Sequence, residues 1–118
     1  MEPPTPSETL GVAVEPRPDA TVVRLTGSAN MDVSAGLRDQ LISLVDTHRK
    51  QLILDLSGLN FISSVGLGGI IAAHLRCRYC HGEIKLVAPQ PPIRELLEVT
   101  KLTKLFPIYE TIESAIKG

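Results

Sequence analysis

The sequence predicts an α/β domain in which strands alternate with helices around a mixed, mostly parallel sheet. Residues 20–26 are β-branched and roughly alternating, which is typical of a strand, and residues 52–54 form a short apolar run of the kind buried on both faces of a sheet. Between these strand-like segments, apolar residues recur at helical spacing. The 118 residues, 43% of them hydrophobic, suffice for one core but not for two. We therefore expect about four to five strands packed by about four helices.

The chain divides into a tail and one domain. Residues 1–10 are polar and rich in proline, so we expect a flexible tail there and assign the domain to residues 11–118. Internal repeats are absent from the sequence.

In the first half of the domain, residues 11–16 fit a short edge strand, and Gly27 is expected to end the strand of residues 20–26. Asp32 is the expected N-cap of the following helix, and the cations of residues 48–50 suit its C-terminus. The side chains that would form the inner face of this helix are Val33, Leu37, Leu41, Leu44 and Val45.

In the second half, the pattern predicts a buried strand over residues 51–56 that runs into a tight turn, and then a helix over 63–79. A strand over 84–87, a helix opened by Pro91-Pro92 and a short strand over 106–109 follow. Thr111 is the expected cap of a last helix that turns Ile112, Ala115 and Ile116 inward.

Composition and charge exclude several classes of function. The formal net charge is −1 and no basic stripe exists, which argues against nucleic-acid binding. No stretch of about 18 apolar residues occurs, so we expect no membrane insertion. The N-terminus has no secretion signal, so a cytoplasmic location with reduced thiols is expected.

The serine pair Ser63-Ser64 opens the predicted second helix and allows two interpretations. A serine at this position commonly caps the helix through its hydroxyl. The same helix end also stabilises an anion, which would suit a phosphorylated serine. Spacing alone does not separate the two interpretations.

A resemblance to a known family bears on that choice. Residues 55–68 read DLSGLNFISSVGLG, which resembles the signature of the STAS family (sulfate transporter and anti-sigma factor antagonist). That signature has Asp-Leu-Ser, variable positions, Phe, Leu or Met, and then Asp-Ser-Ser/Thr-Gly-Leu-Gly. Residues 94–109 and the Leu25-Thr26-Gly27 stretch also resemble the family pattern, so the resemblance covers residues 11–117.

The resemblance implies an STAS-like single domain that acts by binding, without enzymatic activity. It implies an anti-sigma factor antagonist that sequesters an anti-sigma factor with serine-kinase activity and is switched off by phosphorylation at Ser64, with Ser63 as second choice. A serine phosphatase would reset the switch, and the chain itself would be a monomer or weak homodimer. The implied partner-binding residues are Ser28, Asn30, Ser57, Ser63, Ser64, Gly66, Leu67 and Gly68.

The sequence also departs from the family pattern. The acidic residue before the acceptor is Ser63 here, the following small hydroxyl residue is Val65, and the Gly-Glu-Leu-Asp stretch is replaced by Gly27-Ser28-Ala29-Asn30. Three carboxylates common around the acceptor are thus neutral. An alternative use of such a domain is a scaffold subunit of a stress-signalling assembly or an accessory subunit of a lipid-transport ABC complex.

Two further motifs give weaker indications of a binding function. Cys77, Cys80 and His81 match the pattern of haem attachment, and a metal- or haem-binding redox protein is a distant alternative. We expect no metal and no cofactor, because no second Cys/His pair completes a zinc site and no export signal is present. His74 would be a fourth ligand only by awkward helical geometry.

The glycines of residues 66–69 do not match the dinucleotide-binding pattern, because its sixth position is Ile71 here. We interpret these glycines as allowing close packing to the sheet or to a partner. No catalytic constellation of Ser, His and Asp is apparent.

Overall fold

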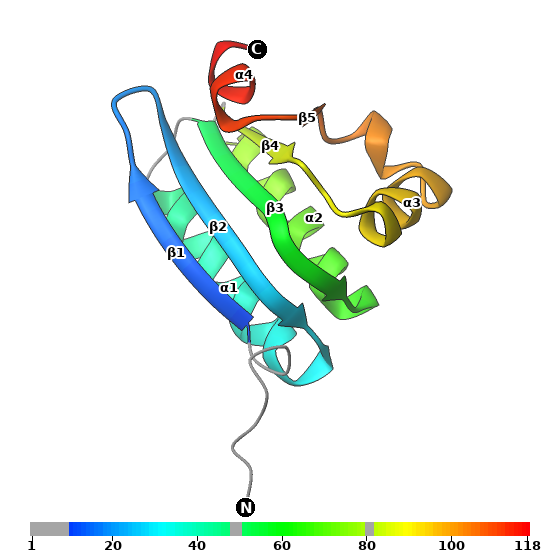
Figure 1. Cartoon of the computed structure of the whole chain (residues 1–118). Coiled ribbons are helices and arrows are strands. Elements are labelled where there is room, and N and C mark those ends of the chain that lie inside the picture. Colours follow the sequence, from blue (N-terminus) through cyan, green and yellow to red (C-terminus); the bar gives the residue numbers. More distant parts are fainter. Residues whose placement is uncertain (1–9, 48–50, 80–81) are drawn as a thin grey trace, which may run out of the picture.

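The computed structural model describes residues 10–47, 51–79 and 82–118. The predicted tail (residues 1–9 of it), the predicted cations of residues 48–50, and Cys80 and His81 lie outside the described residues. Figure 1 shows the elements in chain order. These are β1 (Leu10–Pro16), β2 (Ala20–Ala29), α1 (Met31–Thr47), β3 (Gln51–Ile62), α2 (Ser64–Tyr79), β4 (Glu83–Val87), α3 (Pro91–Val99), the 3₁₀ helix η2 (Leu102–Lys104), β5 (Ile108–Tyr109) and α4 (Ile112–Lys117).

The sheet has five strands in the order β1-β2-β3-β4-β5. The hairpin of β1 and β2 is antiparallel, while the pairs from β2 to β5 are parallel. This confirms the predicted mixed, mostly parallel sheet. The predicted edge strand of residues 11–16 is β1, which begins one residue earlier, so Leu10 belongs to the sheet and not to the predicted tail. Parallel neighbours require crossover connections, which α1, α2 and α3 supply.

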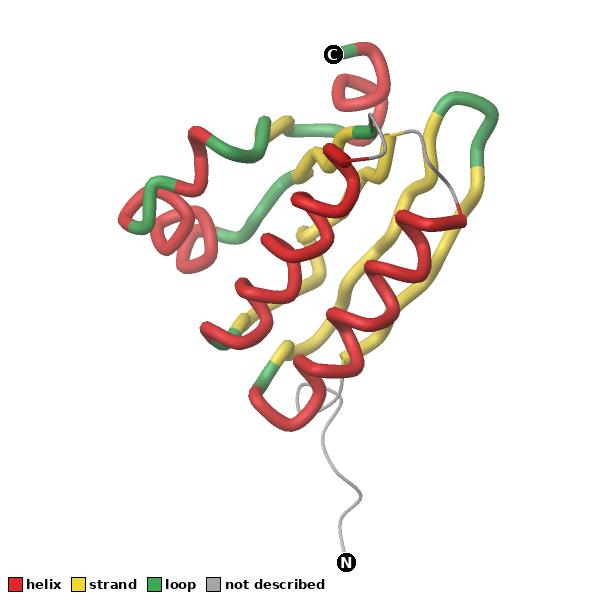
Figure 2. The backbone as a smooth tube through the Cα atoms, turned by 180° about the vertical axis from the view of Figure 1, so that it is seen from behind, coloured by secondary structure: helices red, strands yellow, loops and turns green. Residues whose placement is uncertain are grey.

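Helices cover both faces of the sheet. Figure 2 shows α1 and α2 side by side on one face. The larger core lies beneath them and contains Leu37 and Leu41 of α1 together with Leu52 and Leu54 of β3. On the opposite face, α4 packs Ala115 against a smaller cluster. The buried Lys85 of β4 also stabilises this helix, because its Nζ donates a hydrogen bond to the Ala115 carbonyl (2.8 Å).

Strands β2 and β3 run further than their sequences predict. Gly27 does not end β2, and β3 continues to Ile62 where a tight turn was expected after Leu56. The two strands stay paired through two shifts of register, each of which places one extra residue on β3. These β-bulges bend the strand, and Gly27 takes φ of 89° beside the second one, a conformation that glycine adopts without strain.

Most helix boundaries follow the predictions. Pro91 and Pro92 open α3, and Thr111 caps α4 by accepting a hydrogen bond from the Ser114 N–H, as expected. Asp32 is not the N-cap of the first helix: α1 already begins at Met31, so Asp32 lies inside its first turn. The predicted strand over residues 106–109 shortens to Ile108–Tyr109.

At Gly69 the predicted close approach is to helix α1. A Cβ atom built on Gly69 would lie 2.9 Å from the Arg38 Cβ and 3.2 Å from its Cα, so α1 passes directly over this glycine. Nothing lies within 4 Å of the corresponding position on Gly68. Adjacent glycines of α2 therefore face opposite surroundings, one packed and one open.

Candidate functional site

The candidate site lies where β2 and β3 end and α2 begins (Figure 1). The Ser63 N–H donates a hydrogen bond to the Ala29 carbonyl (2.8 Å), which joins the ends of the two parallel strands. Because β3 enters α2 without a loop, the first turn of the helix projects from this end of the sheet. Unpaired N–H groups and the helix dipole give such a turn affinity for an anion.

The two serines at this junction have different surroundings. Ser63 is buried, and its Oγ accepts a hydrogen bond from the Gly66 N–H (3.0 Å), the geometry of an N-cap. Ser64 is the first residue of α2 and is exposed. In the described part of the chain its hydroxyl has no hydrogen-bond partner. The capping interpretation therefore fits Ser63, and Ser64 is the serine whose hydroxyl is open to another molecule.

Apolar side chains flank Ser64. Phe61, near the end of β3, is 50% exposed, and Val65, the next residue of α2, is 42% exposed. The sequence between Asp55 and Arg76 contains no Asp, Glu, Lys or Arg. The residues of β3 and α2 around Ser64 thus offer hydroxyl, amide and hydrocarbon groups, and sequence reasoning missed the two apolar ones, Phe61 and Val65.

The remaining predicted partner-binding residues do not form one continuous patch. Asn30 is half-buried at the strand end and Gly68 is exposed on α2, whereas Ser28, Gly66 and Leu67 are buried. Ser57 is exposed but lies at the first bulge, roughly 20 Å along β3 from Ser63. The Ser57 carbonyl accepts a hydrogen bond from Gln90 Nε2 (2.8 Å), and the Ser57 N–H donates one to the Asp55 carboxylate (3.0 Å). Asp55 thus orders the backbone at the bulge. The structure places Asn30, Ser64 and Gly68 near the strand end and Ser57 elsewhere.

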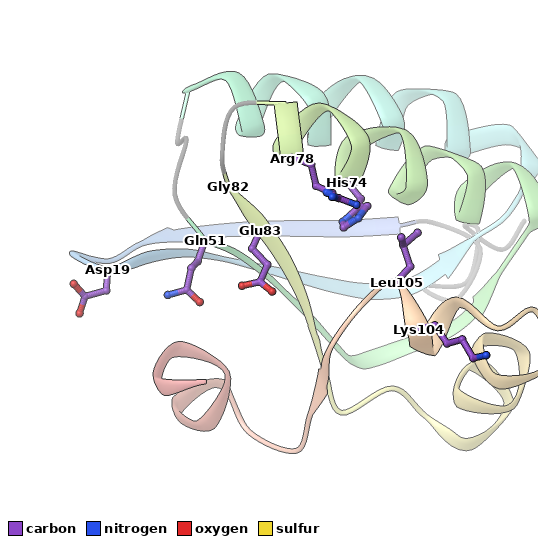
Figure 3. A pocket seen from close by; sticks show the side chains of 8 residues that line it. All are labelled: Asp19, Gln51, His74, Arg78, Gly82, Glu83, Lys104 and Leu105. Carbon is purple, nitrogen blue, oxygen red and sulfur yellow. The ribbon is translucent and has the colours of Figure 1, made fainter.

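The other end of α2 borders a cavity of about 660 Å³ (Figure 3). His74 and Arg78 reach it from α2, Gln51 and Glu83 from the starts of two strands, and Lys104 from η2. His74 is buried with its ring edge-to-face against Phe106, at 4.8 Å between centroids. Neither of its ring nitrogens has a hydrogen-bond partner in the described part of the chain. Burial, reinforced by the positive charge of Arg78 and opposed by Glu83, lowers the pKa of His74 below 6.5.

The cysteine motif is only partly described. Cys77 is a buried thiol on the core side of α2. Within residues 10–47, 51–79 and 82–118, no group of three or more His, Cys, Asp or Glu residues is arranged to hold a metal ion. In the same residues, no helix is long and apolar enough to cross a membrane.

Comparison with known proteins identifies the family. Residues 12–115 match the STAS domain, and the chain belongs to the STAS domain family. Among curated proteins it is similar to a putative anti-sigma factor antagonist, BtrV, of Bordetella bronchiseptica, with 31% identity over 77% of this chain and 78% of that one. It is also similar to the anti-sigma F factor antagonist of Paenibacillus polymyxa, with 28% identity over 91% and 92%.

Solved structures agree with this assignment. The crystal structure of an anti-sigma factor antagonist from Mycobacterium paratuberculosis superposes with a TM-score of 0.83, at 28% identity and covering 93% of both chains. The Bacillus cell fate determinant SpoIIAA in its phosphorylated form superposes with a TM-score of 0.72, covering 91% of this chain and 97% of that one. At 20% identity, the second likeness shows the fold alone.

Proposed function

We propose that this chain is an anti-sigma factor antagonist that acts by binding and is switched off by phosphorylation of Ser64. The unphosphorylated chain binds an anti-sigma factor that is also a serine kinase, and so releases the sigma factor. The kinase transfers the γ-phosphoryl group of ATP to the Ser64 hydroxyl, ADP leaves, and the complex dissociates. A serine phosphatase hydrolyses the phosphoester and restores the binding form.

The different surroundings of Ser63 and Ser64 are the main support for this proposal. Ser63 makes the cap hydrogen bond to Gly66, so α2 keeps its first turn whether or not Ser64 is modified. Ser64 is exposed at the first helical position, where a kinase can reach its hydroxyl. The names of the relatives support the same class of activity for this chain.

Electrostatics explain how a phosphate at Ser64 would act as a switch without unfolding the domain. A phosphoserine adds about −1.5 to −2 charge, and a helix N-terminus tolerates that charge. A docked partner would have to remove the hydration shell of the phosphate, which is costly without a matching cation. Because the sequence between Asp55 and Arg76 contains no charged residue, the phosphate would supply all of the negative charge of this segment. The contrast between the two states should be steeper than where carboxylates already surround the acceptor.

Incubation with the cognate kinase and ATP, followed by peptide mass spectrometry, tests the site of modification. We expect one phosphate on Ser64, none in Ser64→Ala, and normal modification of Ser63→Ala if that variant stays folded. A phosphate on Ser63 would move the acceptor by one residue. Modification of neither serine would favour a scaffold or transport-accessory role.

The docking surface is tested separately with Gly68, which faces open space. Leucine at this position adds a bulky side chain four residues, or one helical turn, from Ser64. We expect Gly68→Leu to fold normally and to lose affinity for the anti-sigma factor about tenfold or more. A folded Gly68→Leu protein that binds as well as the wild type would exclude close approach of the partner at this turn.

A further inference from the structure

The outward face of α2 carries an apolar stripe that the core does not use. Its members, which we call the α2 stripe, are spaced by three, four, three and four residues, the a/d spacing of a helix that pairs with another helix. They are Val65, Gly68, Ala72, Leu75 and Tyr79. Leu75 is 59% exposed and Tyr79 is 88% exposed.

This stripe lies opposite the core side of the same helix. The residues of α2 that enter the core include Leu67, Ile70 and Ala73, all of them buried. A surface helix of a globular domain normally carries polar side chains on its outer face. Figure 2 shows α1 beside α2, and no described helix or strand lies over the outer faces of the two helices. An exposed apolar stripe of this kind marks an interaction surface.

The order of side chains along the stripe favours a second copy in antiparallel orientation. The large residues, Leu75 and Tyr79, lie in the second half, and Gly68, with nothing within 4 Å of its Cβ position, lies in the first half. Antiparallel pairing sets the large half of each copy against the small half of the other, as a knob enters a hole. Parallel pairing would set Gly68 against Gly68 and leave that space empty.

Charge favours the same orientation. The charged residues of α2 are Arg76 and Arg78, both in its last turn. Arg76 forms an ion pair with Asp46 of α1 (2.9 Å), whereas Arg78 has no ion pair in the described part of the chain. Parallel helices would place Arg76 and Arg78 of both copies at the same end of the dimer. Antiparallel helices separate the arginines of one copy from those of the other by most of the roughly 24 Å length of α2 and bring each toward the Ser64 end of the other copy.

We propose that two copies of this chain associate through the α2 stripe as an antiparallel, two-fold symmetric dimer. Every contact occurs twice in such a dimer because both copies present the same surface. We expect one helix face from each copy to bury less than the roughly 1,200 Å² of stable interfaces, so the dimer should be weak and form only at high protein concentration. Val65 and Gly68 lie inside this interface, so the dimer withholds the surface that the proposed function assigns to the anti-sigma factor.

Phosphorylation would strengthen the dimer, an extension that rests on the proposed function. Ser64 and Arg78 lie on the same flank of the stripe at opposite ends of α2. In the antiparallel dimer a phosphate on Ser64 of one copy therefore approaches the Arg78 position of the other. Arg78 is exposed at the border of the cavity, and a charge-assisted pair forms when its guanidinium turns from the cavity toward the phosphate. The chain phosphorylated on Ser64 would thus bind the anti-sigma factor less tightly and a second copy of itself more tightly, and both effects would come from the charge of the phosphate.

Sedimentation velocity of the full chain over 10 μM to 1 mM tests the dimer without any partner protein. We expect concentration-dependent dimerisation, weakened about tenfold or more in Leu75→Asp. Val99→Asp is the matched control, because Val99 is a 73% exposed valine on α3 outside the stripe, and it should dimerise like the wild type. Circular dichroism verifies that both variants are folded.

Either of two results would overturn the dimer: a wild-type chain that stays monomeric at 1 mM, or a dimer equally stable in Leu75→Asp. Ser64→Glu should dimerise about two- to fivefold more tightly, and Ser64→Glu with Arg78→Glu should lose that gain. Equal dimerisation of both Ser64 variants and the wild type would contradict the Ser64–Arg78 contact. None of these readouts depends on binding to an anti-sigma factor, so a failed dimer leaves the proposed function standing.

Discussion

The inward and outward faces of α2 give neighbouring residues of the same type opposite roles. Gly69 lies against Arg38 of α1, while Gly68 faces open space. At the start of the helix, Ser63 is buried and caps the first turn, while Ser64 is exposed. The inward residue of each pair maintains the fold, and the outward one is available to another molecule. Substitutions at paired positions should therefore separate effects on stability from effects on binding.

The largest contrast in stability is expected between the two glycines. Gly69→Ala places a methyl group 2.9 Å from the Arg38 Cβ, so α1 and α2 must move apart. We expect a loss of about 1–3 kcal/mol in the free energy of unfolding. Gly68→Ala meets no atom and should gain up to about 1 kcal/mol from the higher helix propensity of alanine. Urea denaturation measures both, and equal stabilities would mean that the helices do not touch at Gly69.

Cys77 tests the inward face further along α2. Replacing Cys77 and Cys80 with alanine should cost about 1–2 kcal/mol of stability through lost packing at the buried Cys77. Protein purified under reducing conditions should carry no stoichiometric zinc and show no haem absorbance. One equivalent of metal by elemental analysis, absent from the double variant, would establish a metal site and contradict the interpretation of a buried structural thiol.

The serine pair should show a smaller contrast. Ser63→Ala removes the acceptor of the Gly66 N–H, so we expect a loss of about 1 kcal/mol in the free energy of unfolding. Ser64→Ala removes an exposed hydroxyl and should change stability by less than about 0.5 kcal/mol. Thermal denaturation of both variants at one pH measures the difference. A larger loss in Ser64→Ala would show that Ser64 is the cap.

His74, on the inward face of α2, should make the free energy of unfolding of the domain depend on pH. The pKa of His74 in the folded chain lies below its unfolded value of 6.5. Just below pH 6.5, His74 is therefore protonated to a larger extent in the unfolded chain than in the folded chain. Stability should therefore fall as the pH drops from 6.5 toward the folded pKa, by at most about 1.4 kcal/mol per pH unit. His74→Phe keeps a ring against Phe106 and removes the unpartnered nitrogens, so it should flatten this slope. An unchanged slope in His74→Phe would assign the titration to another group.

Sequence periodicity was sufficient to predict the order of the elements and most of their positions. The extension of β3 to Ile62 was not predictable in this way, because the bulges depend on pairing with β2. Periodicity also predicted the serine pair at a helix start. Only the three-dimensional structure assigns the cap to Ser63, since one residue turns a side chain by about 100° on a helix. The α2 stripe has a visible heptad spacing that is easily mistaken for a core-facing pattern, because α2 is apolar on both sides.

The affinity of the anti-sigma factor for the chain before and after phosphorylation tests the central claim most directly. Isothermal titration should show tight binding to the unmodified chain and to Ser64→Ala, and at least about a tenfold loss with phosphorylated Ser64. Ser64→Glu should lie between the two, because a carboxylate carries less charge than a phosphate. Equal affinity for the modified and unmodified chains would contradict the assignment of Ser64 as the switch.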